Sequence, residues 1–166
     1  MNKAAGGDAD LWVSNTETVR HEWVDYNGHM NVAYYILVFD HGTDAVLDLL
    51  DIGEAYRERS NCSVFVAEAH ITYEQEVHEG AELEVRSRIS GFDGKRLILY
   101  HEMFCGDALV ATNEVLCLHV DLNVRRSAPL PEDAAARIQD AAAAHAQLGV
   151  PDRSGRAIVL GSRRPD

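Results

Sequence analysis

The chain has 166 residues, of which 46% are apolar and 25% are charged, and its formal net charge is −12. This length and balance are typical of one globular domain with a sizeable core. The acidic charge argues against nucleic-acid binding, which normally needs a basic face. No apolar run approaches the roughly 20 residues that span a bilayer, so we expect no membrane segment.

The start of the chain is polar and lacks the apolar segment of a signal peptide. Three cysteines at unrelated spacings, Cys62, Cys105 and Cys117, do not form a disulfide framework and fit a reducing compartment. We therefore expect a cytoplasmic protein.

Along the chain, residues 1–15 are predicted to be a flexible segment. A strand is expected over residues 16–24, because Thr, Val, His and Trp favour strands. The run Asp25-Tyr26-Asn27-Gly28 is rich in turn formers, and Asn31 is a suitable helix N-cap.

The clearest helix of the chain begins after Asn31 and is about 20 residues, or roughly 30 Å, long. Gly53 is its expected stop. Asp40, Asp44 and Asp48 run along one flank of its apolar face. Residues that recur at three- and four-residue spacing predict the buried stripe: Val32, Tyr35, Ile36, Phe39, Thr43, Val46, Leu47 and Leu50.

Beyond this helix the pattern changes to strands joined by short turns. Strands are predicted over residues 63–77, 81–90, 96–104 and 109–122, with tight turns around Asp93-Gly94 and Gly106-Asp107. In the second strand, alternation predicts a solvated face that includes Arg86 and Arg88. A final alanine-rich helix is predicted over residues 131–148.

The tail, residues 149–166, is mostly polar, and its one apolar run, residues 157–160, could dock on the body. Consecutive strands with hairpin turns imply an antiparallel sheet, against which the long amphipathic helix must bury its stripe. We therefore predict an α+β hotdog fold, a curved antiparallel sheet around a central helix, in one domain over residues 16–148.

The junction before the long helix is the best candidate for a catalytic site. The first amides of a helix lack partners and carry the positive end of its dipole, so they could stabilise an oxyanion. Asp25 could attack a carbonyl or activate water there, and Gly28 would allow close approach of the backbone. The expected donors are the amides of Val32 and Ala33. Alternatively, Asp25 and Asn31 are only turn and capping residues, and His29 is a packed structural histidine.

The segment Asp25-Tyr26-Asn27-Gly28-His29-Met30-Asn31, followed by Tyr35 or Tyr34, resembles the 4-hydroxybenzoyl-CoA thioesterase-like hotdog superfamily. The pattern of that superfamily is Asp-x-x-Gly-His-Val-Asn-Asn-x-x-Tyr. The resemblance implies an acyl-CoA thioester hydrolase without a cofactor, in which Asp25 is the nucleophile or general base and His29 and Asn31 assist. It also implies a homodimer or a dimer of dimers. This chain departs from the pattern at Val32, which replaces the second Asn, and at Trp23, where many members carry an Asp.

Two further segments, Glu68 to Tyr73 and Lys95-Arg96-Leu97, make the chain most similar to betainyl-CoA thioesterases, which act in carnitine breakdown. The resemblance implies hydrolysis of betainyl-CoA to glycine betaine and CoA. A trimethylammonium group is commonly held by aromatic faces. The aromatic residues around the expected site that could do this are Trp23, Tyr26, Tyr34 and Tyr35, unless they are core or ordinary rim residues.

Four more residues are substrate-binding candidates. Glu68 and His70, two residues apart, share one face of their strand and could reach the site as an acid/base pair or line the acyl pocket; alternatively they form an outward pair. Lys95 and Arg96 could bind the CoA phosphates, or they are solvated charges.

Other activities are weighed against this prediction. The chain has neither a His-Glu-x-x-His nor a Cys-x-x-Cys motif, so no metal site is predicted. A hotdog hydratase or dehydratase is the nearest enzymatic alternative, because Asp25-x-Asn27 matches the start of the hydratase motif Asp-x-Asn-Pro-x-His. A non-catalytic domain that binds acyl thioesters is the third possibility.

Overall fold

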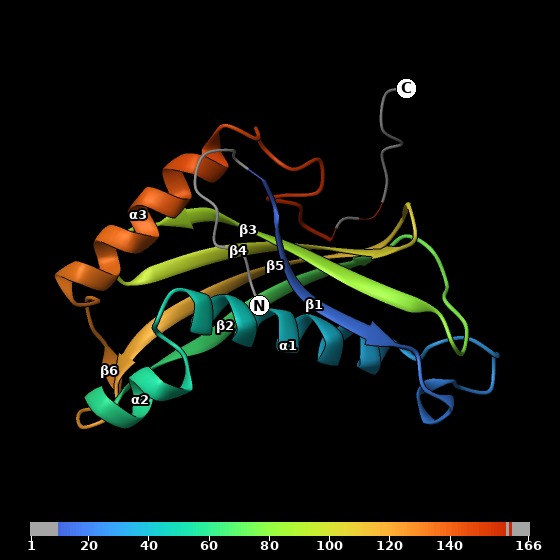
Figure 1. The fold of residues 1–166 in the computed structure, drawn as a ribbon, viewed down its shortest axis with the longest axis horizontal. Coiled ribbons are helices and arrows are strands. Elements are labelled where there is room, and N and C mark those ends of the chain that lie inside the picture. The colour runs from blue at the N-terminus through green and yellow to red at the C-terminus, as the bar shows by residue number, and fades with distance from the viewer. Residues whose placement is uncertain (1–9, 159, 161–166) are drawn as a thin grey trace.

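The computed structural model describes residues 10–158 and residue 160. Its elements follow in the order β1 (Trp12–Thr18), the 3-10 helix η1 (His21–Trp23), α1 (Val32–Leu49), α2 (Glu54–Ser60), β2 (Cys62–Tyr73), β3 (Glu82–Phe92), β4 (Arg96–Cys105), β5 (Ala108–Asp121), β6 (Arg126–Ser127) and α3 (Glu132–Ala146). The antiparallel sheet has the order β1-β3-β4-β5-β2, with β6 paired to β5. The sheet curves along α1 (Figure 1), so the predicted α+β hotdog fold is confirmed.

The start of α1 is as predicted, and its end is not. Asn31 is the N-cap, and its side-chain oxygen accepts a hydrogen bond of 3.0 Å from the amide of Ala33. The helix ends at Leu49, four residues before the predicted stop at Gly53, and two residues further on Asp51 adopts a left-handed φ of 57°. Asp is one of the few non-glycine residues that tolerate this conformation. Gly53 instead precedes α2 as its N-cap.

Most of the predicted stripe of α1 is buried, but Val32 and Ile36 are 55% and 48% exposed. The prediction was wrong for these two because α1 packs mainly against β1, β3 and β4, which turns a neighbouring face inward. Val38, outside the predicted stripe, is fully buried. We call the outward row the exposed stripe; its members follow at four-residue intervals and are Val32, Ile36, Asp40, Asp44 and Asp48.

The first strand lies earlier in the chain than predicted. β1 begins at Trp12 and ends at Thr18, so residues 12–15 are strand and residues 21–23 are not. β1 pairs antiparallel with β3 over Trp12↔Ser87 to Thr18↔Glu82. Its N-terminal half carries Ser14 and Asn15 rather than alternating apolar residues. Hydrophobic periodicity therefore does not predict a strand there. Residues 1–9 lie outside the described part of the chain.

A buried polar chain connects α1 to the sheet. His101, which is fully buried, has Nδ1 2.6 Å from Ser87 Oγ and Nε2 3.2 Å from Thr43 Oγ1. Thr43 Oγ1 in turn donates to the Phe39 carbonyl, and Ser87 Oγ lies 2.6 Å from Ser14 Oγ. Burial lowers the pKa of His101 to about 3, so the imidazole is neutral at physiological pH.

The C-terminal segment crosses the face of the sheet opposite α1, called the outer face below. Arg153 forms a two-pronged ion pair with Glu74, and the Gly155 amide donates to Glu114. Arg88 donates to the Gly149 carbonyl and is buried, so the predicted solvated face of β3 was wrong at that position. The apolar run does not dock: Ile158 is 92% exposed, and Val159 lies outside the described residues.

Candidate active site

The turn of residues 25–28 closes as predicted and presents Asp25 just before α1. The Gly28 amide donates to the Asp25 carbonyl, and the Asn27 amide donates to Asp25 Oδ1 at 2.7 Å. Gly28 has a φ of 85°, which favours glycine. Within residues 10–158, the bond from Asn27 is the one hydrogen bond that the Asp25 carboxylate accepts, so its other oxygen is open to a substrate or water.

The start of α1 leaves open one of the two amide donors that were predicted. The Ala33 amide is occupied by the Asn31 side chain, so it is not open to an oxyanion while the cap is closed. The Tyr34 amide donates to the Asn31 carbonyl. Among the described residues, the Val32 amide has no such partner and is the first-turn donor that remains.

His29 does not contact Asp25 through its side chain. Its Nε2 lies 3.5 Å from Glu76 Oε2, and its carbonyl accepts from the Asp25 amide. Glu76 belongs to the connection between β2 and β3, and its other oxygen faces His78 Nε2 at 4.0 Å. His78 Nδ1 in turn lies 3.0 Å from the Gly28 carbonyl. No sequence pattern indicated this contribution from Glu76 and His78.

The aromatic residues near the turn divide into buried and exposed ones. Trp23 is 3% exposed and lies between Tyr34, stacked on it at 5.3 Å, and Arg20, 4.8 Å from its ring centre. Tyr35 is also buried, and its hydroxyl donates to the Gln75 carbonyl. Neither Trp23 nor Tyr35 presents a free ring face, which agrees with the alternative that they are core residues. Tyr26, at the tip of the turn, is exposed.

Tyr73, which sequence reasoning missed, is a half-exposed aromatic residue near the helix start. Its ring meets Tyr35 edge-on at 5.3 Å. Because Tyr35 belongs to α1, this contact shows that Tyr73 faces the helix side of the sheet. Its place inside the predicted strand 63–77, two positions beyond the apolar Ile71 and therefore on the same face, is the signal that could have identified it.

Glu68 and His70 lie on the outer face, away from α1. In the register of the sheet, His70 pairs with Glu114, and Glu114 pairs with Tyr100. Tyr100 lies between Leu99 and His101, whose side chains point inward, so the side chains of this row point outward. Within one chain Glu68 and His70 therefore do not reach Asp25. Their direction agrees with the alternative that Glu68 and His70 point outward.

Lys95 and Arg96 lie at the hairpin between β3 and β4. Arg96 Nε is 2.5 Å from Asp93 Oδ2. This hairpin is at one end of β3, whereas the pair Thr18↔Glu82, near the Asp25 turn, is at the other. Eleven strand residues span about 35 Å, so these two side chains and Asp25 of the same chain are far apart.

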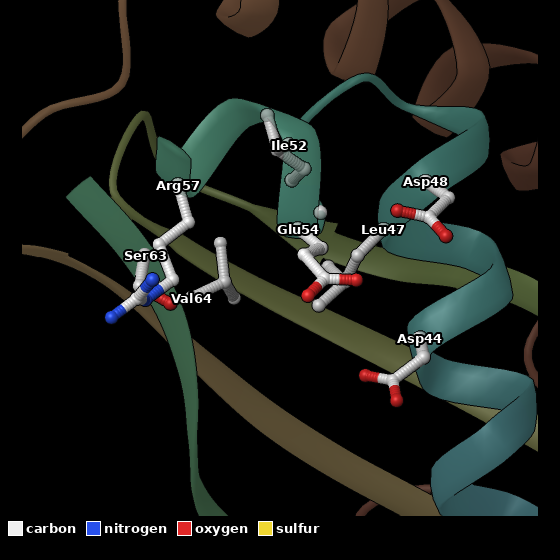
Figure 2. Close-up of a pocket in the computed structure, with 9 residues that line it drawn as sticks. Asp44, Leu47, Asp48, Ile52, Glu54, Arg57, Ser63 and Val64 are labelled. Atoms are coloured by element: carbon white, nitrogen blue, oxygen red, sulfur yellow. The ribbon is translucent and has the colours of Figure 1, made fainter. Parts of the chain in front are cut away.

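A cleft of about 380 Å³ lies between the second half of α1, α2 and the start of β2. Figure 2 shows the carboxylates of Asp44, Asp48 and Glu54 and the Arg57 guanidinium around it, with the apolar side chains of Leu47 and Val64. Burial and the neighbouring carboxylates of Asp40 and Asp48 raise the pKa of Asp44. The cleft does not include Asp25.

Two further findings concern the described residues as a whole. Over residues 10–158, no group of three or more His, Cys, Asp or Glu side chains has the arrangement of a metal site. No helix in that part of the chain is long and apolar enough to cross a membrane.

Fold and site together define a hotdog protein with an Asp-bearing turn at the start of its central helix. Residues 19–138 match the model of the thioesterase-like superfamily, and the chain belongs to that superfamily. The predicted thioesterase class is confirmed at this level.

Among individual relatives, the chain is 43% identical to the betainyl-CoA thioesterase of Pseudomonas aeruginosa over 84% of its own length and 89% of that protein. It is 39% identical to the L-carnitine dehydrogenase/betainyl-CoA thioesterase of Ruegeria pomeroyi, matching 82% of this chain but 28% of that longer protein.

Solved structures support the same relationship. A hypothetical protein from Staphylococcus aureus, solved in complex with CoA, has a TM-score of 0.85 and 26% identity, over 94% of this chain and 100% of that one. A candidate thioesterase from Pseudomonas putida KT2440 has a TM-score of 0.78 and 35% identity, over 92% and 98% of the two chains.

Proposed function

We propose that this chain hydrolyses betainyl-CoA, the thioester of glycine betaine with CoA. Water adds to the thioester carbonyl, the carbon–sulfur bond breaks, and glycine betaine and CoA are released. The observation that carries this proposal is the 43% identity to a betainyl-CoA thioesterase over 84% of the chain. The similarity to a protein solved with CoA supports the CoA part of the substrate.

The geometry of the turn supports Asp25 as the reacting carboxylate. Its free oxygen can attack the carbonyl directly or take a proton from an attacking water. A carbonyl oxygen at the start of α1 would accept from the Val32 amide and meet the positive end of the helix dipole. One such donor is worth about 3 kcal/mol of barrier. His29 and Asn31 then act on the turn and the helix cap rather than on the substrate.

We further propose that the chain works as a homodimer built around β2. β2 is an edge of the sheet, so its outer backbone groups can pair with a second strand. Phe65 and Val66 on this strand are 45% and 49% exposed, and the exposed stripe of α1 adds Val32 and Ile36. A two-fold axis beside β2 would cover these apolar residues with their own copies.

The same two-fold axis supports a cationic acyl group. It would set the two α1 helices antiparallel, with the start of one beside the second half of the other. Asp25 of one chain would then face the cleft of its partner. Three carboxylates there, on Asp44, Asp48 and Glu54, form no ion pair within the described residues. Arg57 also lines the cleft, and the three carboxylates outnumber it, so the cleft would attract a trimethylammonium group more than a neutral acyl group.

Thiol release from a panel of CoA esters tests the activity. Betainyl-CoA, a neutral short-chain ester and an aromatic ester are offered to the wild type and to Asp25→Asn, with Asp107→Asn as a matched control at an exposed turn. We expect the wild type and the Asp107→Asn control to hydrolyse betainyl-CoA faster than the other esters. We expect Asp25→Asn to hydrolyse none of them. Fast release only from other esters would discard the betaine substrate. No release, with binding retained, would favour the non-catalytic domain.

The acidic cleft has a separate test. Asp44→Asn and Glu54→Gln remove one charge each with little change of shape. We expect kcat/KM for betainyl-CoA to fall several-fold, with little change for the neutral ester. An equal change for both esters would contradict a role of the cleft in recognising the cation.

A further inference from the structure

The Asp25 turn is held to the body by a small set of contacts. Tyr26, Asn27 and Gly28 are exposed, so packing does not fix the turn. At its C-terminal side the Met30 amide donates to the Val77 carbonyl at 2.8 Å. The remaining contacts come from side chains of the connection between β2 and β3, and they reach the turn at residues 28 and 29.

Glu76 lies between the two histidines that make these contacts. One carboxylate oxygen is 3.5 Å from His29 Nε2, on the turn, and the other is 4.0 Å from His78 Nε2. His78 reaches the turn from its second ring nitrogen, 3.0 Å from the Gly28 carbonyl. Because a carbonyl only accepts, Nδ1 of His78 carries the proton in this contact. The Glu76 carboxylate therefore lies next to both histidines that join the β2–β3 connection to the turn.

The geometry points to Glu76 as a positioning residue for Asp25. The Asp25 amide donates to the carbonyl of His29, and the Gly28 amide donates to the carbonyl of Asp25. The two residues hydrogen-bonded to the Asp25 backbone are thus the ones that Glu76 contacts, His29 directly and Gly28 through His78. Removing the Glu76 charge loosens the turn at residues 28 and 29, and Asp25 then shifts relative to the start of α1.

This inference rests on the proposed function, because it assigns Glu76 a role in the reaction of Asp25. A misplacement of a reacting group lowers the rate of the chemical step, while substrate binding elsewhere is kept. The side chain of Glu76 is 63% exposed, so its ion pairs are weakened by solvent and the effect is modest. We expect Glu76→Gln to lower kcat about 3- to 5-fold and to leave KM within about 2-fold.

Glu79→Gln is a matched control on the same connection. Glu79 is similarly exposed and contacts His21 at 2.9 Å, a closer pair than either pair of Glu76, but it does not reach residues 25–29. We expect Glu79→Gln to leave kcat unchanged within 1.5-fold. Equal values of kcat for the two variants would overturn the inference.

A double mutant shows whether Glu76 acts through Asp25. In single-turnover measurements at high enzyme concentration, Glu76→Gln should have no further effect once Asp25 is replaced by Asn. A further loss of the same 3- to 5-fold would mean that Glu76 acts independently of Asp25, and it would overturn the inference.

Hydrogen exchange tests the same idea without activity. The amides of Asp25 and Gly28 should exchange several-fold faster in Glu76→Gln than in Glu79→Gln, while those of β4 are unchanged. This result would stand even if no CoA ester were hydrolysed, which separates failure of the inference from failure of the proposed function. Unchanged exchange at both amides would overturn the inference.

Discussion

Acidification should destabilise the protein through His101, which joins α1 to the sheet from a fully buried position. Burial lowers the pKa of this imidazole from 6.5 to about 3. Between these values the unfolded chain binds a proton that the folded protein does not. The free energy of unfolding therefore falls as the pH falls through 6.5 toward 3, and the contribution is fully regained above about pH 6.5.

The size of the effect follows from the two pKa values. A shift from 6.5 to about 3 is worth at most about 5 kcal/mol, and at pH 5 about 2 kcal/mol of this has been lost relative to pH 7.5. His145, whose pKa burial also lowers, changes stability in the same direction. The difference between the wild type and a His101 variant isolates the contribution of His101.

Urea denaturation at pH 7.5 and pH 5.0, at fixed protein concentration, measures this difference. His101→Gln keeps a donor and an acceptor but does not titrate, so it should lose about 2 kcal/mol less than the wild type on acidification. Thr43→Val is the control, because it removes one contact of the imidazole and keeps the imidazole buried. Its pH dependence should match that of the wild type. An equal loss in His101→Gln and wild type would refute the assignment.

Three other substitutions have defined expectations. Asn31→Ala removes the cap of α1 and should cost about 1 kcal/mol of unfolding free energy in urea, whereas Asn31→Ser should restore most of it. Gly42→Ala places a methyl group 3.0 Å from Ser14 Oγ and should destabilise by about 1–3 kcal/mol, with a lower Tm. Arg153→Ala breaks the pair that holds the pKa of Glu74 near 2, and limited proteolysis should then cleave residues 149–158 faster while kcat is unchanged.

The parts of the fold that the sequence predicted are those where local chemistry and packing agree. Asn31 caps α1 because its side chain can reach the Ala33 amide from a position just outside the helix. The hairpin turns around Gly94 and Gly106 have positive φ, as Asp-Gly and Gly-Asp sequences require. β3, β4 and β5 lie within two residues of their predicted bounds, because apolar residues alternate along them.

The parts that the sequence did not predict depend on contacts with distant residues. Ser14 lies in a strand because its hydroxyl joins the buried chain of Ser87 and His101, not because it is apolar. Glu76 and His78 are ordinary polar loop residues in the sequence. They gain a role only because the connection that bears them passes beside the turn of residues 25–29.

The direction of Glu68 and His70 shows how one residue changes a prediction about a site. Val64, before residue 67, lies on the helix side of β2, where it lines the cleft. With strict alternation, Glu68 and His70 would lie on that side as well. The register shifts between Val66 and Glu68, and one extra residue in a strand sends every later side chain to the opposite face.

The same shift turns Tyr73 toward α1 and the Asp25 turn. Ala67, the extra residue, carries no turn or packing signal, so spacing alone predicts that Glu68 and His70 share a face but not which face it is. The outer face also carries the C-terminal segment, which is bound there through Glu74, directly after β2, and Glu114 of β5. Tyr73, at the end of β2, is thereby left half-exposed on the helix side of the sheet, beside Tyr35 of α1.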